Sequence, residues 1–240
     1  MIETADGRVP VIASADGNGT DVAVARARSA VACGADALMV LPPMFIKPDP
    51  MGVERYYLRV AEAGGVPVMV QDAPQLVGYA IGIDSLERMH AANPLIASVK
   101  LEGLPAGEKT AAVIARLGGA MTVFAGWGGL SFWEGLQRGA SGCMPAANLG
   151  TALADVYELF SAGRVAEAAN AFDRVVPLVA WSMQSIDLGV WCAKESLVRA
   201  GVLTTATMRE PAALPDDVMR MEFARLVEAV GGPFGDAGSR

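Results

Sequence analysis

Short apolar runs recur along the first two thirds of the chain, and each is followed by a stretch with the periodicity of an amphipathic helix. The runs have the length of buried strands, and segments with Gly, Pro or Asn separate them from the stretches that follow. We therefore predict six strand–helix units, with strands over 9–13, 37–41, 66–70, 96–101, 122–125 and 142–145. The helices that follow them are expected over 21–33, 50–63, 83–92, 107–117, 130–138 and 149–162.

The alternation of strands and helices stops after Gly163. Helical periodicity then continues without further strand-like runs, over 164–179, 186–200 and 216–230. The glycine-containing and polar end from Gly231 to Arg240 is expected to fray. The pattern predicts a strand–helix domain over 1–163 and a helical C-terminal domain over 164–240.

Repeated strand–helix units indicate an α/β protein with a parallel sheet and right-handed crossovers. The sheet is either open and doubly wound or closed as a (β/α)8 barrel. No glycine-rich phosphate fingerprint favours the open sheet. A barrel normally has eight units, so the barrel interpretation leaves two units unaccounted for.

The overall charge and composition narrow the classes of partner. The chain has 240 residues, of which 52% are hydrophobic and 19% charged, as is usual for a globular protein. Its net charge of −7 and pI near 4.8 argue against a nucleic acid or an anionic membrane as partner and favour small molecules. The three cysteines, Cys33, Cys143 and Cys192, have no CxxC spacing, which suggests neither disulfides nor zinc. With no signal-like or membrane-spanning apolar stretch, we expect a cytoplasmic protein.

The strongest candidate for chemistry is Lys100, which ends the fourth apolar run and is followed by Leu101 and Glu102. The run is typical of a strand buried on both faces. One interpretation is that Lys100 extends to solvent from the end of its strand. The other is that its amine lies in a desolvated place, where a neutral amine can attack a ketone carbonyl.

Several segments, in the right order, resemble the dihydrodipicolinate synthase and N-acetylneuraminate lyase superfamily. They are Val9–Ala13, Asn18–Thr20, Gly34–Pro43, Lys47–Pro48, Val66–Val70 with Pro74, Ser98–Lys100, and Lys194–Leu197 with Gly201. The resemblance implies a (β/α)8 barrel with a three-helix C-terminal domain, assembled as a homotetramer. It also implies a Schiff base between a lysine on the sixth strand and pyruvate or another 2-oxo acid, with no cofactor. Lys100 matches that lysine.

The same resemblance places Val9 at the start of the family's third strand. It therefore implies that the first two strand–helix units are absent before Met1. In the family these units carry a Gly-Thr-Thr-Gly-Glu type loop that holds the carboxylate of the 2-oxo acid, and no such run occurs in this chain. We therefore expect weak anchoring of the substrate, and a barrel with an open edge.

Two substitutions set the chain apart from the family. Gln71 stands where the family usually has a catalytic tyrosine, and a glutamine amide donates hydrogen bonds but does not exchange protons near neutral pH. Leu76 replaces the arginine with which the synthases bind a substrate carboxylate, which disfavours lysine biosynthesis. Glu102 lies on the same strand face as Lys100 and could shuttle the proton. The alternatives are a solvated loop carboxylate, or one that keeps Lys100 charged.

Other candidates have a structural alternative. Asp72 carries the same ambiguity as Glu102 and could also cap the turn before Pro74. By the resemblance, Gly126 and Cys143 line the substrate site, although Gly126 suits a tight turn and Cys143 a small core residue. His90, the single histidine, lies in a helix without partners for a catalytic or metal site.

We expect a Schiff-base lyase that acts on a 2-oxo or 2-oxo-3-deoxy acid by aldol cleavage or dehydration. In this assignment Lys100, Gln71 and Glu102 are catalytic, and Gly126, Cys143 and Leu76 contact the substrate. No metal or organic cofactor is required, and the partners are the small-molecule substrate and other copies of the chain. The alternative is a non-catalytic barrel fragment that serves as a subunit of an assembly.

Overall fold

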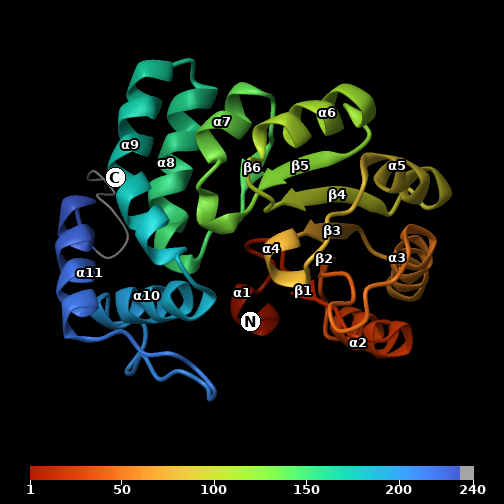
Figure 1. Cartoon of the computed structure of the whole chain (residues 1–240), viewed down its shortest axis with the longest axis horizontal. Coiled ribbons are helices and arrows are strands. Elements are labelled where there is room, and N and C mark those ends of the chain that lie inside the picture. Colours follow the sequence, from red (N-terminus) through yellow and green to blue (C-terminus); the bar gives the residue numbers. More distant parts are fainter. Residues whose placement is uncertain (233–240) are drawn as a thin grey trace. The chain divides into compact units, whose positions relative to one another are not determined.

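The computed structural model describes residues 1–232, which form two compact units (Figure 1). The first contains Met1–Phe124 and Arg138–Ser141, and the second contains Ala125–Gln137 and the described residues from Gly142 onward. The chain end beyond residue 232, where fraying was predicted, lies outside the described part. The predicted domain boundary after Gly163 and the helical C-terminal domain stay predictions.

The sheet has six strands in sequence order, as the six predicted units require. They are β1 (Ile12–Ser14), β2 (Ala37–Val40), β3 (Val68–Asp72), β4 (Ile96–Leu101), β5 (Thr122–Ala125) and β6 (Gly142–Cys143). Strands β1 to β4 pair in parallel, each with the next. The prediction of an α/β protein with a parallel sheet is therefore confirmed.

Two strands begin later than the apolar runs suggested, and a proline precedes each. Strand β1 begins after Pro10. The N–H of Val11 donates to the Asp36 side chain at 2.7 Å and not to a neighbouring strand. Strand β3 begins after Pro67, whose carbonyl accepts from Leu38 at 2.8 Å. Because proline has no N–H to donate, regular pairing starts beyond it. At its other end, β3 continues two residues beyond the predicted run and pairs with β4 as far as Asp72.

The helices of the first unit are close to the predicted ranges. They are α1 (Ile2–Ala5), α2 (Thr20–Ala32), α3 (Pro50–Gly64), α4 (Pro74–Val77), α5 (Ile83–Ala92) and α6 (Gly107–Leu117). The short helices α1 and α4 were not predicted. Helix α3 shows strong local signals: Asp49 accepts from the N–H of Gly52 at 2.6 Å, Pro50 opens the helix, and Gly65 ends it at φ 65°.

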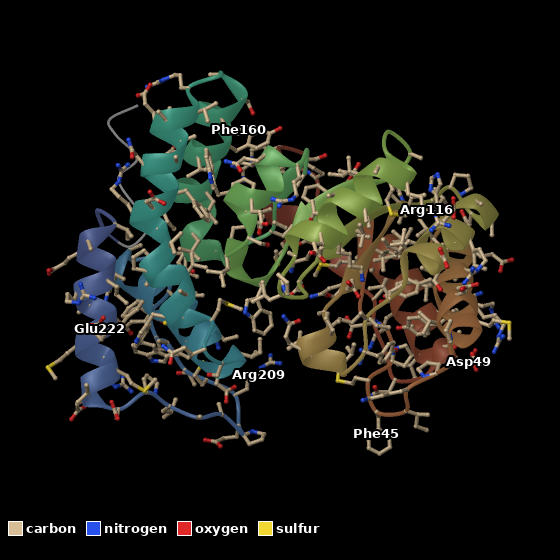
Figure 2. All side chains as sticks on the ribbon, turned by 45° about the horizontal axis from the view of Figure 1, so that its top comes forward. Phe45, Asp49, Arg116, Phe160, Arg209 and Glu222 are labelled. Atoms are coloured by element: carbon tan, nitrogen blue, oxygen red, sulfur yellow. The ribbon has the colours of Figure 1, made fainter. Side chains whose placement is uncertain are left out.

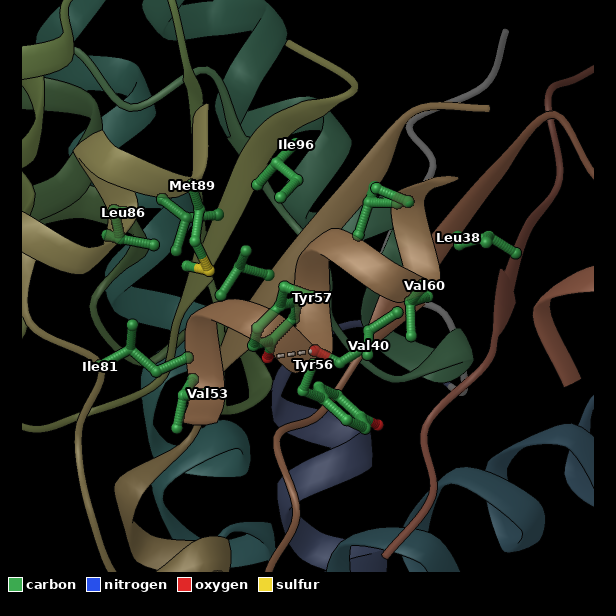
Figure 3. Close-up of a cluster of buried hydrophobic side chains, with 14 of the residues drawn as sticks. Leu38, Val40, Val53, Tyr56, Tyr57, Val60, Ile81, Leu86, Met89 and Ile96 are labelled. Carbon is green, nitrogen blue, oxygen red and sulfur yellow. Dashed lines mark hydrogen bonds between the residues drawn. The ribbon is translucent and has the colours of Figure 1, made fainter. Parts of the chain in front are cut away.

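The core of the first unit is formed by its strands and the helices α2, α3, α5 and α6, and Figure 3 shows part of it. Tyr56 and Tyr57 are among its largest buried side chains and meet edge to face with their ring centroids 5.4 Å apart. The Tyr57 hydroxyl donates to the Val40 carbonyl at 2.9 Å. Burial raises the pKa of Tyr56 to about 12 and that of Tyr57 well above its usual value. Both phenols are thus neutral structural groups at ordinary pH.

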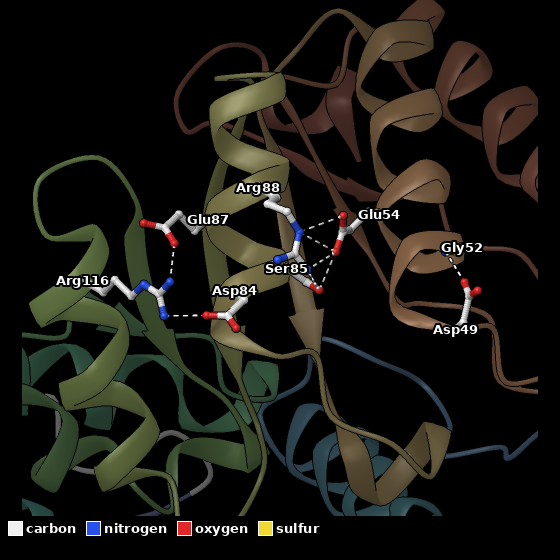
Figure 4. Close-up of polar contacts among 8 residues, drawn as sticks. All are labelled: Asp49, Gly52, Glu54, Asp84, Ser85, Glu87, Arg88 and Arg116. Atoms are coloured by element: carbon white, nitrogen blue, oxygen red, sulfur yellow. Dashed lines mark hydrogen bonds and ion pairs between the residues drawn. The ribbon is translucent and has the colours of Figure 1, made fainter.

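Exposed ion pairs join neighbouring helices of this unit (Figure 4). Arg116 on α6 binds Asp84 at 2.5 Å and Glu87 at 2.6 Å, both on α5. Arg88 on α5 binds Glu54 on α3 at 2.7 Å. These contacts fix α5 between α3 and α6, although exposed pairs of this kind contribute little stability individually.

The second unit is mostly helical. It contains η1 (Trp127–Gly129), α7 (Phe132–Gln137), η2 (Ala147–Leu149), α8 (Gly150–Ser161), α9 (Val165–Ser182), α10 (Ile186–Arg199) and α11 (Asp217–Ala229). The last three helices match the predicted ones closely. Its core includes Trp191 against Phe223, with centroids 5.0 Å apart. Trp133 on α7 meets Phe160 on α8, labelled in Figure 2, edge to face at 5.7 Å. None of the helices in the described part has the length and apolar character needed to span a membrane.

Candidate active site

Lys100 lies on β4 with its amine directed to a buried carboxylate. The Lys100 side chain is only 12% exposed, and its Nζ is 3.1 Å from Oε1 of Glu102, whose own side chain is 6% exposed. Its neighbours Val99 and Leu101 are buried in the core of the unit, as the strand alternation requires. The Lys100 amine therefore contacts the buried Glu102 carboxylate and does not extend into bulk water.

Gln71 completes the group from the neighbouring strand. In the parallel pairing of β3 with β4, Gln71 stands opposite Lys100. The Gln71 amide donates from Nε2 to Oε1 of Glu102 at 2.6 Å, so this oxygen receives both the amide and the ammonium. The three residues that the sequence assigned to catalysis are thus in contact.

The backbone around Glu102 is fixed from two sides. Its N–H donates to the Asp72 carbonyl at 2.9 Å, which extends the pairing of β3 and β4 by one residue. Its own carbonyl accepts from Nε2 of Gln75 at 2.9 Å. The position of the carboxylate is therefore set by main-chain and side-chain contacts together.

The second carboxylate oxygen of Glu102 is open. Within residues 1–232, no group donates to Oε2, and no fully buried side-chain oxygen lacks a partner. Oε2 is therefore not completely buried, while Oε1 is in contact with Lys100 and Gln71. A carboxylate of this kind can accept a proton from a molecule bound next to the lysine.

Asp72 forms a separate ion pair at the end of β3. The residue is 1% exposed, and its two oxygens accept from the N–H of Ile81 at 2.8 Å and from Nζ of Lys109 at 2.5 Å. Nζ of Lys109 also donates to the Ile81 carbonyl at 2.6 Å. Asp72 therefore fixes the segment before α5 instead of capping the turn at Pro74. Lys109 was not predicted, because a contact between residues 37 positions apart leaves no local signal in the sequence.

The proposed substrate-contacting residues have less distinctive surroundings. Leu76 is half-buried on α4, where its N–H donates to the Ala73 carbonyl. Gly126 and Cys143 belong to the second unit; the Gly126 carbonyl accepts from the N–H of Gly129 at 2.9 Å in a tight turn. Gly129 has φ 89°, and a Cβ there would lie 2.8 Å from Leu153. The roles of Leu76, Gly126 and Cys143 in substrate binding stay predictions.

The remaining titratable candidates have structural contacts. His90 on α5 places Nδ1 2.9 Å from the Ile96 carbonyl, which ties the end of the helix to β4. Cys192 is buried in the second core, and burial raises its pKa to about 12, so it is an inert thiol. Among residues 1–232, no three His, Cys, Asp or Glu side chains gather as a set of metal ligands.

The sequence is similar to a protein family and to proteins of known activity. The model of the dihydrodipicolinate synthetase family matches residues 1–230. An L-2-keto-3-deoxyarabonate dehydratase from Azospirillum brasilense is 30% identical over 218 residues, which cover 88% of this chain and 69% of that protein. A 4-hydroxy-tetrahydrodipicolinate synthase from Rhizobium meliloti is 30% identical over 189 residues, covering 74% and 61%. The matched part of the chain therefore spans 69% of the length of the dehydratase and 61% of the length of the synthase.

Solved structures show the same fold. Dihydrodipicolinate synthase from Rhodopseudomonas palustris matches with a TM-score of 0.84 at 25% identity. The match covers 94% of this chain and 76% of the chain of that enzyme. The enzyme from Aquifex aeolicus matches with a TM-score of 0.89 at 20% identity, covering 97% and 78%. Sequence and fold agree, and the chain belongs to the dihydrodipicolinate synthetase family.

Proposed function

We propose that the protein is a lyase that acts on a 2-oxo acid through a Schiff base at Lys100. The observation that carries the proposal is the contact between the buried Lys100 amine and Glu102, whose carboxylate also accepts from Gln71. A nucleophilic lysine needs a neighbouring group that can take its proton, and Glu102 lies within reach. The family of the chain supports the same chemistry.

The first half of the reaction forms the imine. Lys100 transfers a proton to Glu102, and its amine then attacks the ketone carbon of the substrate to form a C–N bond. The resulting carbinolamine takes the proton back on its hydroxyl oxygen and loses that oxygen as water. The product is a protonated imine, which attracts the electrons of any bond broken at the adjacent carbon.

The second half removes a proton from C3. Oε2 of Glu102 is the open oxygen, so it accepts that proton while the electron pair moves into the imine to give an enamine. In a 2-oxo-3-deoxy acid, the enamine then expels the C4 hydroxyl, which leaves as water with the proton returned by Glu102. Hydrolysis of the new imine releases the dehydrated 2-oxo acid and restores Lys100.

We assign proton transfer to Glu102 and a positioning role to Gln71. A glutamine amide has no acidic or basic function near neutral pH, but its hydrogen bond of 2.6 Å holds the carboxylate beside the amine. Leu76 offers no charge for a second substrate carboxylate, which argues against the synthase reaction. The similarity to a 2-keto-3-deoxyarabonate dehydratase supports dehydration of a sugar-derived acid.

Borohydride trapping tests the Schiff base. Incubation with pyruvate and sodium borohydride should add one reduced pyruvyl group, and peptide mass spectrometry should locate it at Lys100. Lys100→Ala should give no adduct. Lys47→Met serves as the control, because it removes an exposed lysine of the same unit without leaving a buried carboxylate unpaired, and it should still be labelled at Lys100. Labelling elsewhere, or none, would contradict the proposal.

A substrate test separates dehydration from aldol cleavage. The protein is incubated with L-2-keto-3-deoxyarabonate, and the products are followed by NMR. Dehydration gives a dehydrated 2-oxo acid and no pyruvate, whereas aldol cleavage releases pyruvate and an aldehyde. Pyruvate as the main product would contradict the assignment to dehydration but leave the imine intact.

A second candidate is a non-catalytic subunit of an assembly. The observation that favours it is Gln71, because the family's proton-transferring tyrosine is absent from that position. This candidate predicts no adduct at Lys100 and no product from any 2-oxo acid. The trapping experiment therefore decides between the two candidates.

A further inference from the structure

We propose that a cavity at the edge of the first unit binds a small organic carboxylate with an apolar body, and that Lys47 recognises its charge. The cavity has a volume of about 410 Å³ and lies between the start of α3 and the segment that leads into α5. Volumes of about 300–1,000 Å³ are typical of small-molecule sites. It is lined by none of the residues of the Lys100 group.

The inner wall of the cavity is apolar and fixed. Pro48, Pro50, Val53, Tyr79 and Ile81 contribute most of this wall. The Tyr79 hydroxyl donates to the carbonyl of Pro43 at 2.7 Å, and burial raises its pKa to about 12. The phenol is thus neutral and its donor is used, so the ring offers an apolar face to a ligand.

Two of the charged side chains on the rim are already paired. Figure 4 shows Arg88 bound to Glu54 and Asp84 bound to Arg116, at 2.7 and 2.5 Å. Their charges are largely compensated within the protein. The Ser85 hydroxyl also donates to Glu54, so it is not available as a donor to a ligand.

Lys47 differs from these side chains. Its Nζ donates to the Gly78 carbonyl at 3.2 Å, and within residues 1–232 it has no carboxylate within 4.0 Å. An ammonium has three donors, so at least two remain for a ligand. A carboxylate is the complementary group, because it supplies both the missing charge and the acceptors.

Contacts within the protein hold the walls of the cavity. Gly78 adopts φ 79°, and a Cβ there would lie 2.7 Å from Nζ of Lys47, so the glycine makes room for the lysine. Ile81 is held at both its N–H and its carbonyl, by Asp72 and Lys109. Because the walls do not have to be ordered on binding, even a small ligand can bind measurably.

Phenylacetate is a suitable probe, because it has a carboxylate and an apolar ring but no ketone that could react with Lys100. We expect titration of the full chain, followed by methyl NMR, to shift the signals of Val53, Ala80 and Ile81. Lys47→Met should weaken binding at least fivefold at low ionic strength. Lys194→Met is the control and should leave the affinity unchanged, because Lys194 is a half-buried lysine outside the cavity that likewise donates to a single carbonyl.

Two further arms make the test decisive. 2-Phenylethanol has the same ring without the charge and should bind at least fivefold more weakly than phenylacetate. Lys100→Ala should bind phenylacetate as the unchanged protein does, which separates this cavity from the proposed active site. Equal affinity of the Lys47 and Lys194 variants, equal binding of the alcohol, or shifts confined to other residues would each overturn the proposal.

Discussion

Two lysine–carboxylate pairs lie within the first unit, and they differ in what surrounds the carboxylate. In the pair Lys100–Glu102, one carboxylate oxygen receives both donors and the other has no donor among residues 1–232. In the pair Lys109–Asp72, each oxygen has a donor, and the lysine also binds the Ile81 carbonyl. A pair with an open oxygen can exchange a proton with a ligand, whereas a saturated pair only holds the structure.

Burial alone would not distinguish the two pairs. Asp72 is more deeply buried than Glu102, with side-chain exposures of 1% and 6%, and yet it is the structural one. Lys109 is 24% exposed and Lys100 12%. Each carboxylate has two donors, and what differs is that both are on one oxygen of Glu102 and one is on each oxygen of Asp72.

The largest expected effect is on turnover in Glu102→Gln. The amide keeps the shape and an acceptor for Gln71 but cannot take a proton, so we expect kcat to fall roughly 10²- to 10⁴-fold. Steady-state kinetics with L-2-keto-3-deoxyarabonate would measure it. Asp72→Asn is the matched control and should retain most of the activity. A Glu102→Gln variant with near-normal kcat would refute the proton-transfer role.

The next effect is on stability in Asp72→Ala. This change leaves the Ile81 N–H and the Lys109 amine without their acceptor inside the unit, and breaking such a buried pair costs about 3 kcal/mol in the free energy of unfolding. Urea denaturation monitored by circular dichroism would measure it. Lys109→Met with Asp72→Leu should recover part of the loss, since no charge is then left unpaired. A loss below about 0.5 kcal/mol would show that the contact is unimportant.

A smaller effect is expected for Gln71→Leu. Without the amide, Glu102 loses one donor and its position beside Lys100 becomes less defined. We expect kcat to fall about tenfold, equivalent to roughly 1.4 kcal/mol of transition-state stabilisation, with KM little changed. Because only positioning is lost, Gln71→Asn should be no better than leucine, as its shorter amide does not reach Glu102. Full activity of Gln71→Leu would remove this residue from the site.

The smallest effect concerns the pair Arg88–Glu54, in which the guanidinium is exposed to solvent and the carboxylate is largely buried. The Arg88 guanidinium lowers the pKa of Glu54 below its usual value of 4.5. The folded state thus binds this proton less readily than the unfolded state, so the stabilisation is present above about pH 4.5 and is lost as the pH falls through the lowered pKa. The stability difference between the protein and Glu54→Gln should shrink on acidification from pH 7 to pH 3. An unchanged difference would contradict this assignment.

The candidate residues around Lys100 are easier to read from the sequence than their arrangement in space. Lys100 ends an apolar run, and Glu102 follows at the spacing that shares a strand face, so both are readable locally. The position of Gln71 opposite Lys100 could not be read in this way, because the apolar run suggested that β3 ended at Val70. Strand β3 continues to Asp72, and its pairing with β4 changes register between Val68 and Met69, beyond which Gln71 stands opposite Lys100. The apolar run did not reveal this, because it ends at Val70 and the two polar residues that continue the strand interrupt the pattern.

The sequence by itself determined the alternation of strands and helices, the parallel sheet and the choice of Lys100, because hydrophobic periodicity and turn residues act over a few positions. Only the tertiary structure decided which carboxylate is open and which is saturated. Glu102 and Asp72 look alike in sequence, since each follows an apolar run. Their difference arises from partners 31 to 37 positions away along the chain, Gln71 for one and Lys109 for the other, which the register of the strands and the packing of α6 bring into contact.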